Sequence, residues 1–276
     1  MRIRHMVESD LPAVLRMASG EGWVSDITEF RIFIEFNPFG CFICAMDGRI
    51  LGSIMTFCHA ESAWVGNFIV SKEYRGRGIG RRLLSQAIEY LDKKKKQIYV
   101  NAADDARKLY KKFDFKDVIS VDRWQGKAVK PAGDTENPRE AMSDILSFIE
   151  LDARIWGDER FALISRLSSL RHSRSYFGLP GFLMYGNTGD SITIGPWEVK
   201  GGDEEIAEKL LISGLSGLRP GSKILLDVPA VNEKAARILA RHKFETVGST
   251  MFMCRGKSPR IHFKEIFSLA TMGSMG

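Results

Sequence analysis

Long apolar runs are missing from this sequence. Its apolar segments, at residues 42–46, 50–58 and 68–70, are short, and polar residues or glycine interrupt them. Crossing a bilayer takes roughly 20 consecutive apolar residues, so no membrane partner is expected. The first ten residues also lack the apolar core of a secretory signal. We therefore expect a cytoplasmic protein.

Cysteine is scarce, with four residues in the chain. Cys41 and Cys44 form a C-x-x-C pair, but the apolar residues between them are typical of a buried strand. Cys58 and Cys254 do not add a second ligand pair at the spacing of a zinc site. We therefore expect reduced thiols in the core and no metal.

A strong excess of one charge is also absent, because the formal net charge is only +6. This modest positive charge is compatible with an anionic ligand and with a nucleic acid, and it does not distinguish between them. The basic run 93–96 ends a predicted helix, where the helix dipole favours cations. It lacks interleaved aromatics, so a solvated helix end is the better interpretation and a nucleic-acid partner the weaker one.

What the chain does have is the composition of a globular protein, with 276 residues of which 44% are hydrophobic and 27% charged. Hydrophobic periodicity predicts strands and helices in alternation. In the first half, after a short strand and a helix that starts at Asp10, the predicted elements are strands 42–45, 50–58 and 63–71, helix 78–94, strand 97–102, helix 105–113 and strand 115–124. In the second half they are helices 141–149 and 158–170, strands 181–186 and 191–199, helix 204–215, strand 223–228, helix 233–242 and strands 244–254 and 261–269.

The second half repeats the first at an offset of 129 residues. Matching residues fall in matching elements: Gly66 with Gly195, Val70 with Val199, Ala106 with Ala235, Lys112 with Arg241 and Phe115 with Phe244. We predict two copies of one α/β unit with a mixed sheet. The predicted division is a first domain at 1–125, a polar linker at 126–143 and a second domain at 144–276.

One motif carries the chemistry of the first copy. Strand 68–70 leads into Arg75-Gly76-Arg77-Gly78-Ile79-Gly80, which opens an amphipathic helix. Glycines let the backbone approach a ligand, and the first amides of the helix carry the positive end of its dipole. Arginines surround this point, so the loop suits a pyrophosphate. Neither a Walker A loop nor a G-x-G-x-x-G motif is present.

This run resembles the R/Q-x-x-G-x-G/A signature of the GNAT (GCN5-related) N-acetyltransferase superfamily. The turn at 47–52 and the run 106–115, which is similar to the family's A-x-x-L-Y-x-K-x-G-F, extend the resemblance over residues 2–123. It implies tandem GNAT-like (acyl-CoA N-acyltransferase) folds with an active first domain. Two positions depart from the pattern: Ala103 replaces a usual Asn that contacts pantetheine, and Asp114 replaces a Gly.

The resemblance implies an acetyltransferase that moves acetyl from acetyl-CoA, its co-substrate, to a primary amine of a small molecule or peptide. It places acetyl-CoA on Phe68, Ile69, Val70, Arg75, Gly76, Arg77, Gly78, Ile79, Gly80 and Arg81. Tyr110 takes the position of the general acid that protonates the departing thiolate, which suits a phenol with an ordinary pKa near 10. A non-catalytic acyl-CoA sensor or a basic nucleic-acid-binding protein are the alternatives, and homodimerisation is left open.

The second copy is predicted to have lost this chemistry. The offset aligns the loop with residues 204–209, which are rich in acids that repel phosphate, and Tyr110 with Leu239. In similar tandem proteins the degenerate domain helps to wall the acceptor pocket. Candidate acceptor contacts are Trp23, Asp26, Arg160 and His172, and Glu61 or His59 is a candidate base acting through water.

Overall fold

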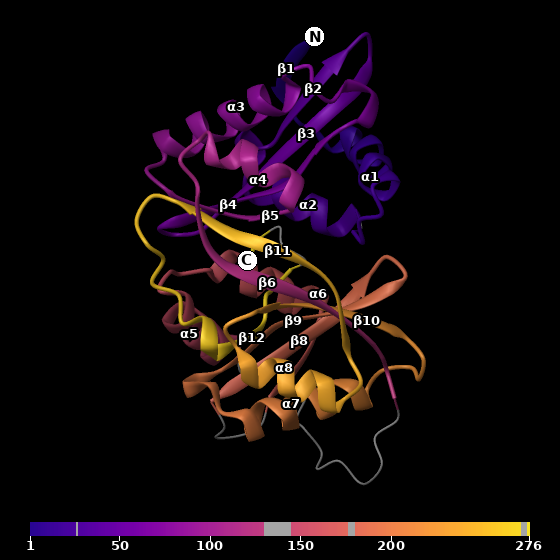
Figure 1. Cartoon of the computed structure of the whole chain (residues 1–276), viewed down its shortest axis with the longest axis vertical. Helices are drawn as coiled ribbons and strands as arrows, with labels where there is room; N and C mark the ends of the chain where they lie inside the picture. The colour runs from indigo at the N-terminus through magenta and orange to yellow at the C-terminus, as the bar shows by residue number, and fades with distance from the viewer. Residues whose placement is uncertain (26, 130–144, 176–179, 272–274) are drawn as a thin grey trace.

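The computed structural model describes residues 1–25, 27–129, 145–175, 180–271 and 275–276 (Figure 1). Within these ranges twelve strands form one mixed sheet, in the order β1-β2-β3-β4-β5-β11-β6-β10-β9-β8-β7, and β12 pairs with β9. The strands are β1 (Arg2–His5), β2 (Phe42–Met46), β3 (Arg49–Cys58), β4 (Ser62–Val70), β5 (Gln97–Ala102), β6 (Lys116–Lys127), β7 (His172–Ser175), β8 (Gly181–Thr188), β9 (Ser191–Val199), β10 (Lys223–Pro229), β11 (Glu245–Arg255) and β12 (Ile266–Ser268).

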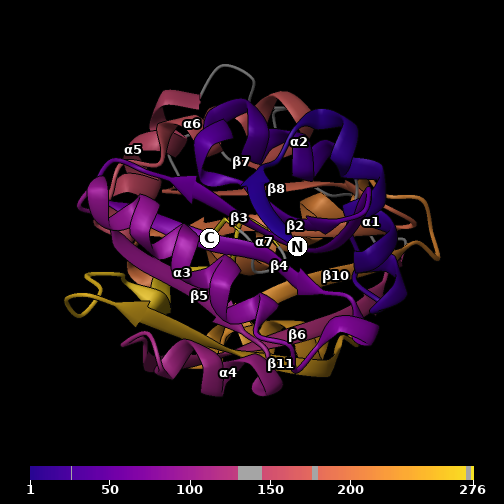
Figure 2. The same ribbon diagram turned by 90° about the horizontal axis from the view of Figure 1, so that it is seen from above.

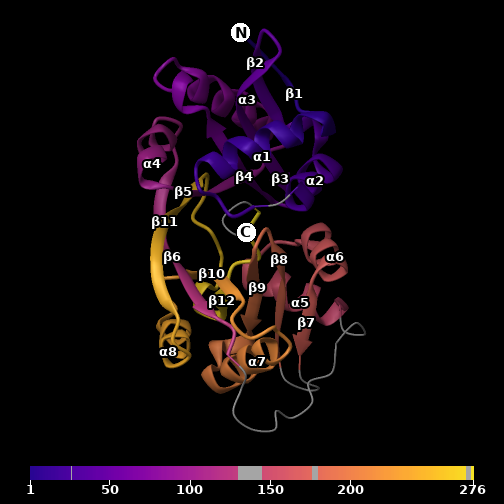
Figure 3. The same cartoon turned by 90° about the vertical axis from the view of Figure 1, so that its right-hand side faces the viewer.

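Helices cover both faces of the sheet (Figures 2 and 3). They are α1 (Leu11–Gly20), α2 (Ile27–Phe36), α3 (Ile79–Lys93), α4 (Asp104–Lys111), α5 (Ile145–Trp156), α6 (Phe161–Leu170), α7 (Glu204–Ser216) and α8 (Glu233–Arg241). The predicted apolar face of α3, from Ile79 to Leu91, is buried against β2–β4. On the other side of the sheet, α1, α2, α5 and α6 share one core that includes Phe33, Phe148 and Leu167.

The two halves exchange their last long strands. After α4 the chain crosses to the second half, where β6 pairs antiparallel with β10 and aligns Trp124 with Leu226. In return β11 lies between β5 and β6, with Phe252 opposite Asn101. Arg123 donates to both carboxylate oxygens of Asp227 across the β6–β10 pair, at 2.8 Å each. Neither half of the sheet is therefore complete without a strand of the other.

Several predicted boundaries need correction. The second-half helix predicted at 141–149 is α5, which runs on to Trp156, and 141–144 lie outside the described residues. The strand predicted at 261–269 is confined to β12. No helix was predicted where α2 lies. The predicted linker begins inside β6, which ends at Lys127, and its residues 130–143 lie outside the described part of the chain.

The 129-residue offset holds for three pairs of elements, including α4 and α8, which start at it. β4 and β9 start and end at this offset, and β6 and β11 start at it. The offset fails for α3 and α7, which start 125 residues apart, and for β5 and β10, which start 126 residues apart. The loop from β4 to α3 covers residues 71–78, whereas the turn from β9 to α7 covers only 200–203. Residues 204–209 therefore lie in α7 and do not correspond to Arg75–Gly80, because the second copy has a shorter connection.

Candidate active site

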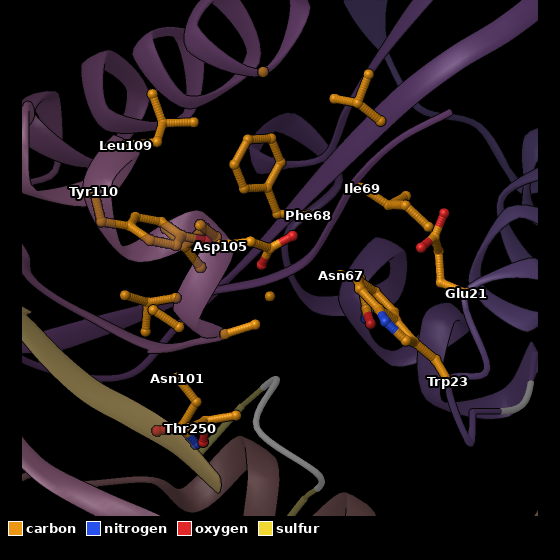
Figure 4. A pocket seen from close by; sticks show the side chains of 18 of the residues that line it. Glu21, Trp23, Asn67, Phe68, Ile69, Asn101, Asp105, Leu109, Tyr110 and Thr250 are labelled. Atoms are coloured by element: carbon orange, nitrogen blue, oxygen red, sulfur yellow. The ribbon is translucent and has the colours of Figure 1, made fainter. Parts of the chain in front are cut away.

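The strands β4 and β5 run in parallel and then separate. Their register pairs run from Ser62 with Gln97 to Trp64 with Tyr99, and the described residues beyond that point form no further pair. The rings of Trp64, Tyr99 and Phe252 close the narrow end, with centroids 5.2–5.8 Å apart. The wide end opens into a cavity of about 640 Å³ (Figure 4). Beyond Trp64 the β5 side of β4 has no strand partner among the described residues, so backbone groups there are available to a ligand.

A bulge in β4 shapes the cavity wall. The register with β3 shifts between Ser53 and Met55, opposite Asn67, whose φ is +47°. The Ser53 hydroxyl donates to the Asn67 carbonyl at 3.3 Å, and Asn67 lines the cavity. Bulges redirect side chains and often lie beside active sites. The sequence gives only a weak signal for this bulge. Asparagine adopts a positive φ more readily than most residues, but it is not confined to such positions.

The glycine–arginine loop lies at one end of the cavity. Gly76 and Gly78 have φ values of +76° and +77°, and Gly78 is the N-cap residue of α3. A Cβ at either position would meet nothing within 4 Å, so backbone conformation and not crowding favours glycine there. Among the described residues, no side chain caps α3. Its first turn can therefore offer amide donors to an anion.

All of the predicted cofactor-binding residues except Arg77 line this cavity. The Arg75 guanidinium contacts Glu21 at 2.7 Å and donates to the Val70 carbonyl at 3.0 Å, which fixes it at the loop. Arg77 instead lies over the Tyr74 ring, 5.2 Å from its centroid. Phe68 closes the space beside Gly80, where a Cβ would come within 3.3 Å of its ring.

Tyr110 extends from α4 into the same cavity, where Figure 4 shows it beside Asp105. Its ring packs edge-on against Phe68 and Phe115, with centroids 6.0 and 5.3 Å away. Only 3% of its surface is exposed. Burial raises the pKa of Tyr110 well above its usual value, and the charge of Asp105 adds to the rise. The phenol therefore keeps its proton at neutral pH and is a weaker acid than the phenol of ordinary pKa expected from the sequence.

The predicted acceptor contacts have mixed outcomes. Trp23 lines the cavity, while Asp26 lies outside the described residues. Arg160 is buried away from the cavity, where it pairs with Asp152 and stacks 3.7 Å from the Trp156 ring centroid. His172 packs against the Tyr185 ring at 5.3 Å and does not line the cavity either.

Neither candidate base lies in the cavity lining. His59 is buried, and because a carbonyl only accepts, its Nε2–H must donate to the Met275 carbonyl at 3.2 Å. Burial and the charge of Arg160 lower the pKa of His59 to about 3. Glu61 is exposed, and its backbone N–H donates to Asp158 at 2.9 Å. Both residues lie at the closed end of the strand separation, before the Trp64–Tyr99 pair.

Sequence reasoning missed the polar residues at the far end of the cavity. Asn101 comes from β5, Arg123 from β6 and Thr250 from β11. Two of these strands are exchanged between the halves. No local pattern signals that exchange.

Other features seen in the sequence lie elsewhere. In the basic run, Lys93 pairs with Glu89 at 2.7 Å, Lys94 lies over the Tyr90 ring and Lys96 donates to the Ala60 carbonyl. The described residues contain no group of three or more His, Cys, Asp or Glu side chains arranged to hold a metal ion. Among the helices in the described ranges, none combines the length and apolarity needed to cross a membrane.

Comparison with protein families finds the same domain type twice. Residues 37–117 match one family model described as "Acetyltransferase (GNAT) domain", and residues 148–268 match another with the same description. Together the two matches cover most of the chain, and they confirm the predicted tandem arrangement.

Individual proteins agree with this assignment. Holothin acyltransferase of a Pseudoalteromonas species is 23% identical over 262 residues, which cover 92% of this chain and 88% of that protein. A probable spermine N(1)-acetyltransferase of Bacillus subtilis subsp. natto is 23% identical over 42% of this chain and 87% of its own.

Solved structures share the fold. A putative acetyltransferase from Pyrococcus horikoshii has a TM-score of 0.84 at 21% identity, over 99% of this chain and 95% of its own. A tandem GNAT protein from the clavulanic acid biosynthesis pathway has a TM-score of 0.63 at 14% identity, over 93% of this chain and 99% of its own.

Proposed function

The chain is a GNAT-family acetyltransferase, and on that premise we propose that it transfers the acetyl group of acetyl-CoA to a primary amine of a small molecule or peptide. One observation carries the proposal: a single cavity contains the separated strands, the glycine–arginine loop and Tyr110. In the proposed reaction these would supply a backbone edge, an anion site and a proton donor.

The first copy has room for a pantetheine chain, and the second copy supports this by contrast. There β9 and β10 share only two register pairs, and β12 lies against the end of β9, with Ile266 opposite Glu198. In the first copy no described strand takes the corresponding place beside Val70. An extended chain of amides would bind there as β12 binds in the second copy. The first-turn amides of α3, with Arg75 and Arg81, would hold the diphosphate.

The proposed reaction is direct attack. The amine nitrogen forms a bond to the thioester carbonyl carbon, the carbon–sulfur bond breaks, and Tyr110 donates its proton to the departing sulfur before recovering one from solvent. An amine that arrives as ammonium must first lose a proton. Glu29 and Asp105 line the cavity and could accept it through water. Holding both substrates in one cavity supplies part of the rate by orientation.

Calorimetry with acetyl-CoA, followed by an assay of free thiol with a library of amines, tests the proposal. We expect one acetyl-CoA per chain, because the loop occurs in the first copy alone, and thiol release with at least one amine. Failure to bind acetyl-CoA would contradict the proposal. Binding without thiol release from any amine would favour the acyl-CoA sensor instead.

A further inference from the structure

The end of the cavity farthest from the loop carries polar side chains without partners. Both polar atoms of the Asn101 carboxamide and the hydroxyl of Thr250 are buried, and neither side chain has a hydrogen-bond partner among the described residues. Both residues line the cavity. Buried polar groups in native proteins are nearly always paired, and one left unpaired costs stability. These groups therefore point to a ligand.

Strand register places the two side chains together. β5 and β11 are antiparallel, with Phe252 opposite Asn101 and Met251 opposite Ala102. Thr250 is therefore the diagonal neighbour of Asn101 and lies on the same face of the sheet. Figure 4 shows the two side by side below the cavity. Residues of the opposite face, such as Val100, belong to the core that α3 covers, and Val100 also lines the cavity.

The chemistry of the pair selects a neutral group. A carboxamide offers two donor hydrogens and an acceptor oxygen, and a hydroxyl offers one donor and acceptor capacity. Neither supplies a countercharge, and burying an unpaired ion is costly. Arg123 lines the cavity as well, but its guanidinium is already held by both oxygens of Asp227. A hydroxyl or an amide matches this pair, whereas a second ammonium or a carboxylate does not.

We propose that Asn101 and Thr250 together bind a neutral hydroxyl or amide group that the acceptor carries in addition to its amine. The inference rests on the proposed acetyl transfer and narrows its substrate class. It also gives the strand exchange a role, since Thr250 reaches the first-copy cavity only because β11 crosses over.

Paired amines test this inference. Amino alcohols and amino amides of two to six carbons are compared with plain alkylamines of equal length and with 1,4-diaminobutane, by thiol release at saturating acetyl-CoA. We expect the best polar acceptor to exceed its plain partner by about tenfold or more in kcat/KM, the effect of one hydrogen bond. Thr250→Val and Asn101→Leu keep the side-chain volume and should remove most of that preference.

Two readouts separate recognition from a structural effect. In Thr250→Val, the loss of kcat/KM should be larger for each polar acceptor than for the plain amine of equal length. Thr246→Val, at an exposed position of the same strand, should keep the preference. Equal rates within every pair, a preference for the diamine, or a preference that survives both variants would overturn the inference and leave acetyl transfer standing. Failure of every amine would remove the proposed function as well.

Discussion

The two copies of the fold differ most in what fills the gap between two parallel strands. In the first copy the gap between β4 and β5 is a cavity. In the second copy β12 pairs with β9, the Leu269 N–H donates to the Asp227 carbonyl of β10 at 2.9 Å, and the Ser268 hydroxyl donates to Ile194 at 2.8 Å. The same architecture therefore leaves backbone groups for a ligand in one copy and uses them internally in the other.

The following helices show the same contrast. The N-cap residue of α7 is Asp203, whose carboxylate accepts from the amides of Glu205 and Ile206 at 3.0 and 3.1 Å. Glu204 in its first turn pairs with Arg237 and Arg241 of α8. Amides that a carboxylate already holds are not available to a phosphate. In the described part of the chain no side chain caps α3 in this way, and the loop before α3 contributes arginines.

Removing the hydroxyl of Tyr110 should have the largest effect. Tyr110→Phe keeps the ring contacts but cannot protonate sulfur, so kcat should fall by about 100-fold or more, with acetyl-CoA affinity nearly unchanged. Leu239→Met, at the equivalent buried position of the second copy, should leave kcat unchanged. Steady-state kinetics and calorimetry measure both. Parallel losses of kcat and affinity would show that Tyr110 is only structural.

Displacing β12 is expected to have the next largest effect. A Cβ at Gly195 would lie 1.9 Å from the Leu269 carbonyl oxygen, so Gly195→Ala forces the two segments apart. The free energy of unfolding should fall by about 1–3 kcal/mol, as measured by urea denaturation. Gly248→Ala on β11, where a Cβ meets nothing within 4 Å, is the control. Equal losses of unfolding free energy in the two variants would show that the close contact between Gly195 and the segment that follows β12 does not stabilise the fold.

A pair of glycine substitutions distinguishes the role of the turn before α3 from that of the turn before α7. Gly78 and Gly201 both have positive φ and open space around a Cβ, so valine strains the backbone similarly at each. Gly78→Val should weaken acetyl-CoA binding by about tenfold, since it alters the turn that would hold the diphosphate. Gly201→Val should leave binding intact. A similar loss in both variants, seen by calorimetry, would assign the effect to global strain.

Local patterns predicted much of the fold and part of the site. The bounds of β5 and β9 match the predicted ranges, because alternating side chains between turn residues define a strand locally. Glycines, arginines and Tyr110 could be found for the same reason, since they lie in short motifs. Their roles remain predictions.

The remaining features depend on long-range pairing. Nothing near Thr250 or Arg123 in the sequence indicates that their strands cross between the halves, because register is set by partners more than 100 residues away. A fixed offset also hides the shorter turn at 200–203. It therefore aligned the loop of the first copy with a helix of the second.

The exchanged strands set an order of events during synthesis. The edge of β5 is covered by β11, which ends at Arg255. Well over 100 residues are therefore synthesised between the end of β6 and the end of β11. At about 5–20 residues per second this delay lasts roughly 6–26 s. An uncovered edge is a template for pairing with other chains. The β5 edge of the first copy thus stays uncovered until β11 has been synthesised. Translation that stops before β11 would release a fragment with this edge exposed and prone to aggregation.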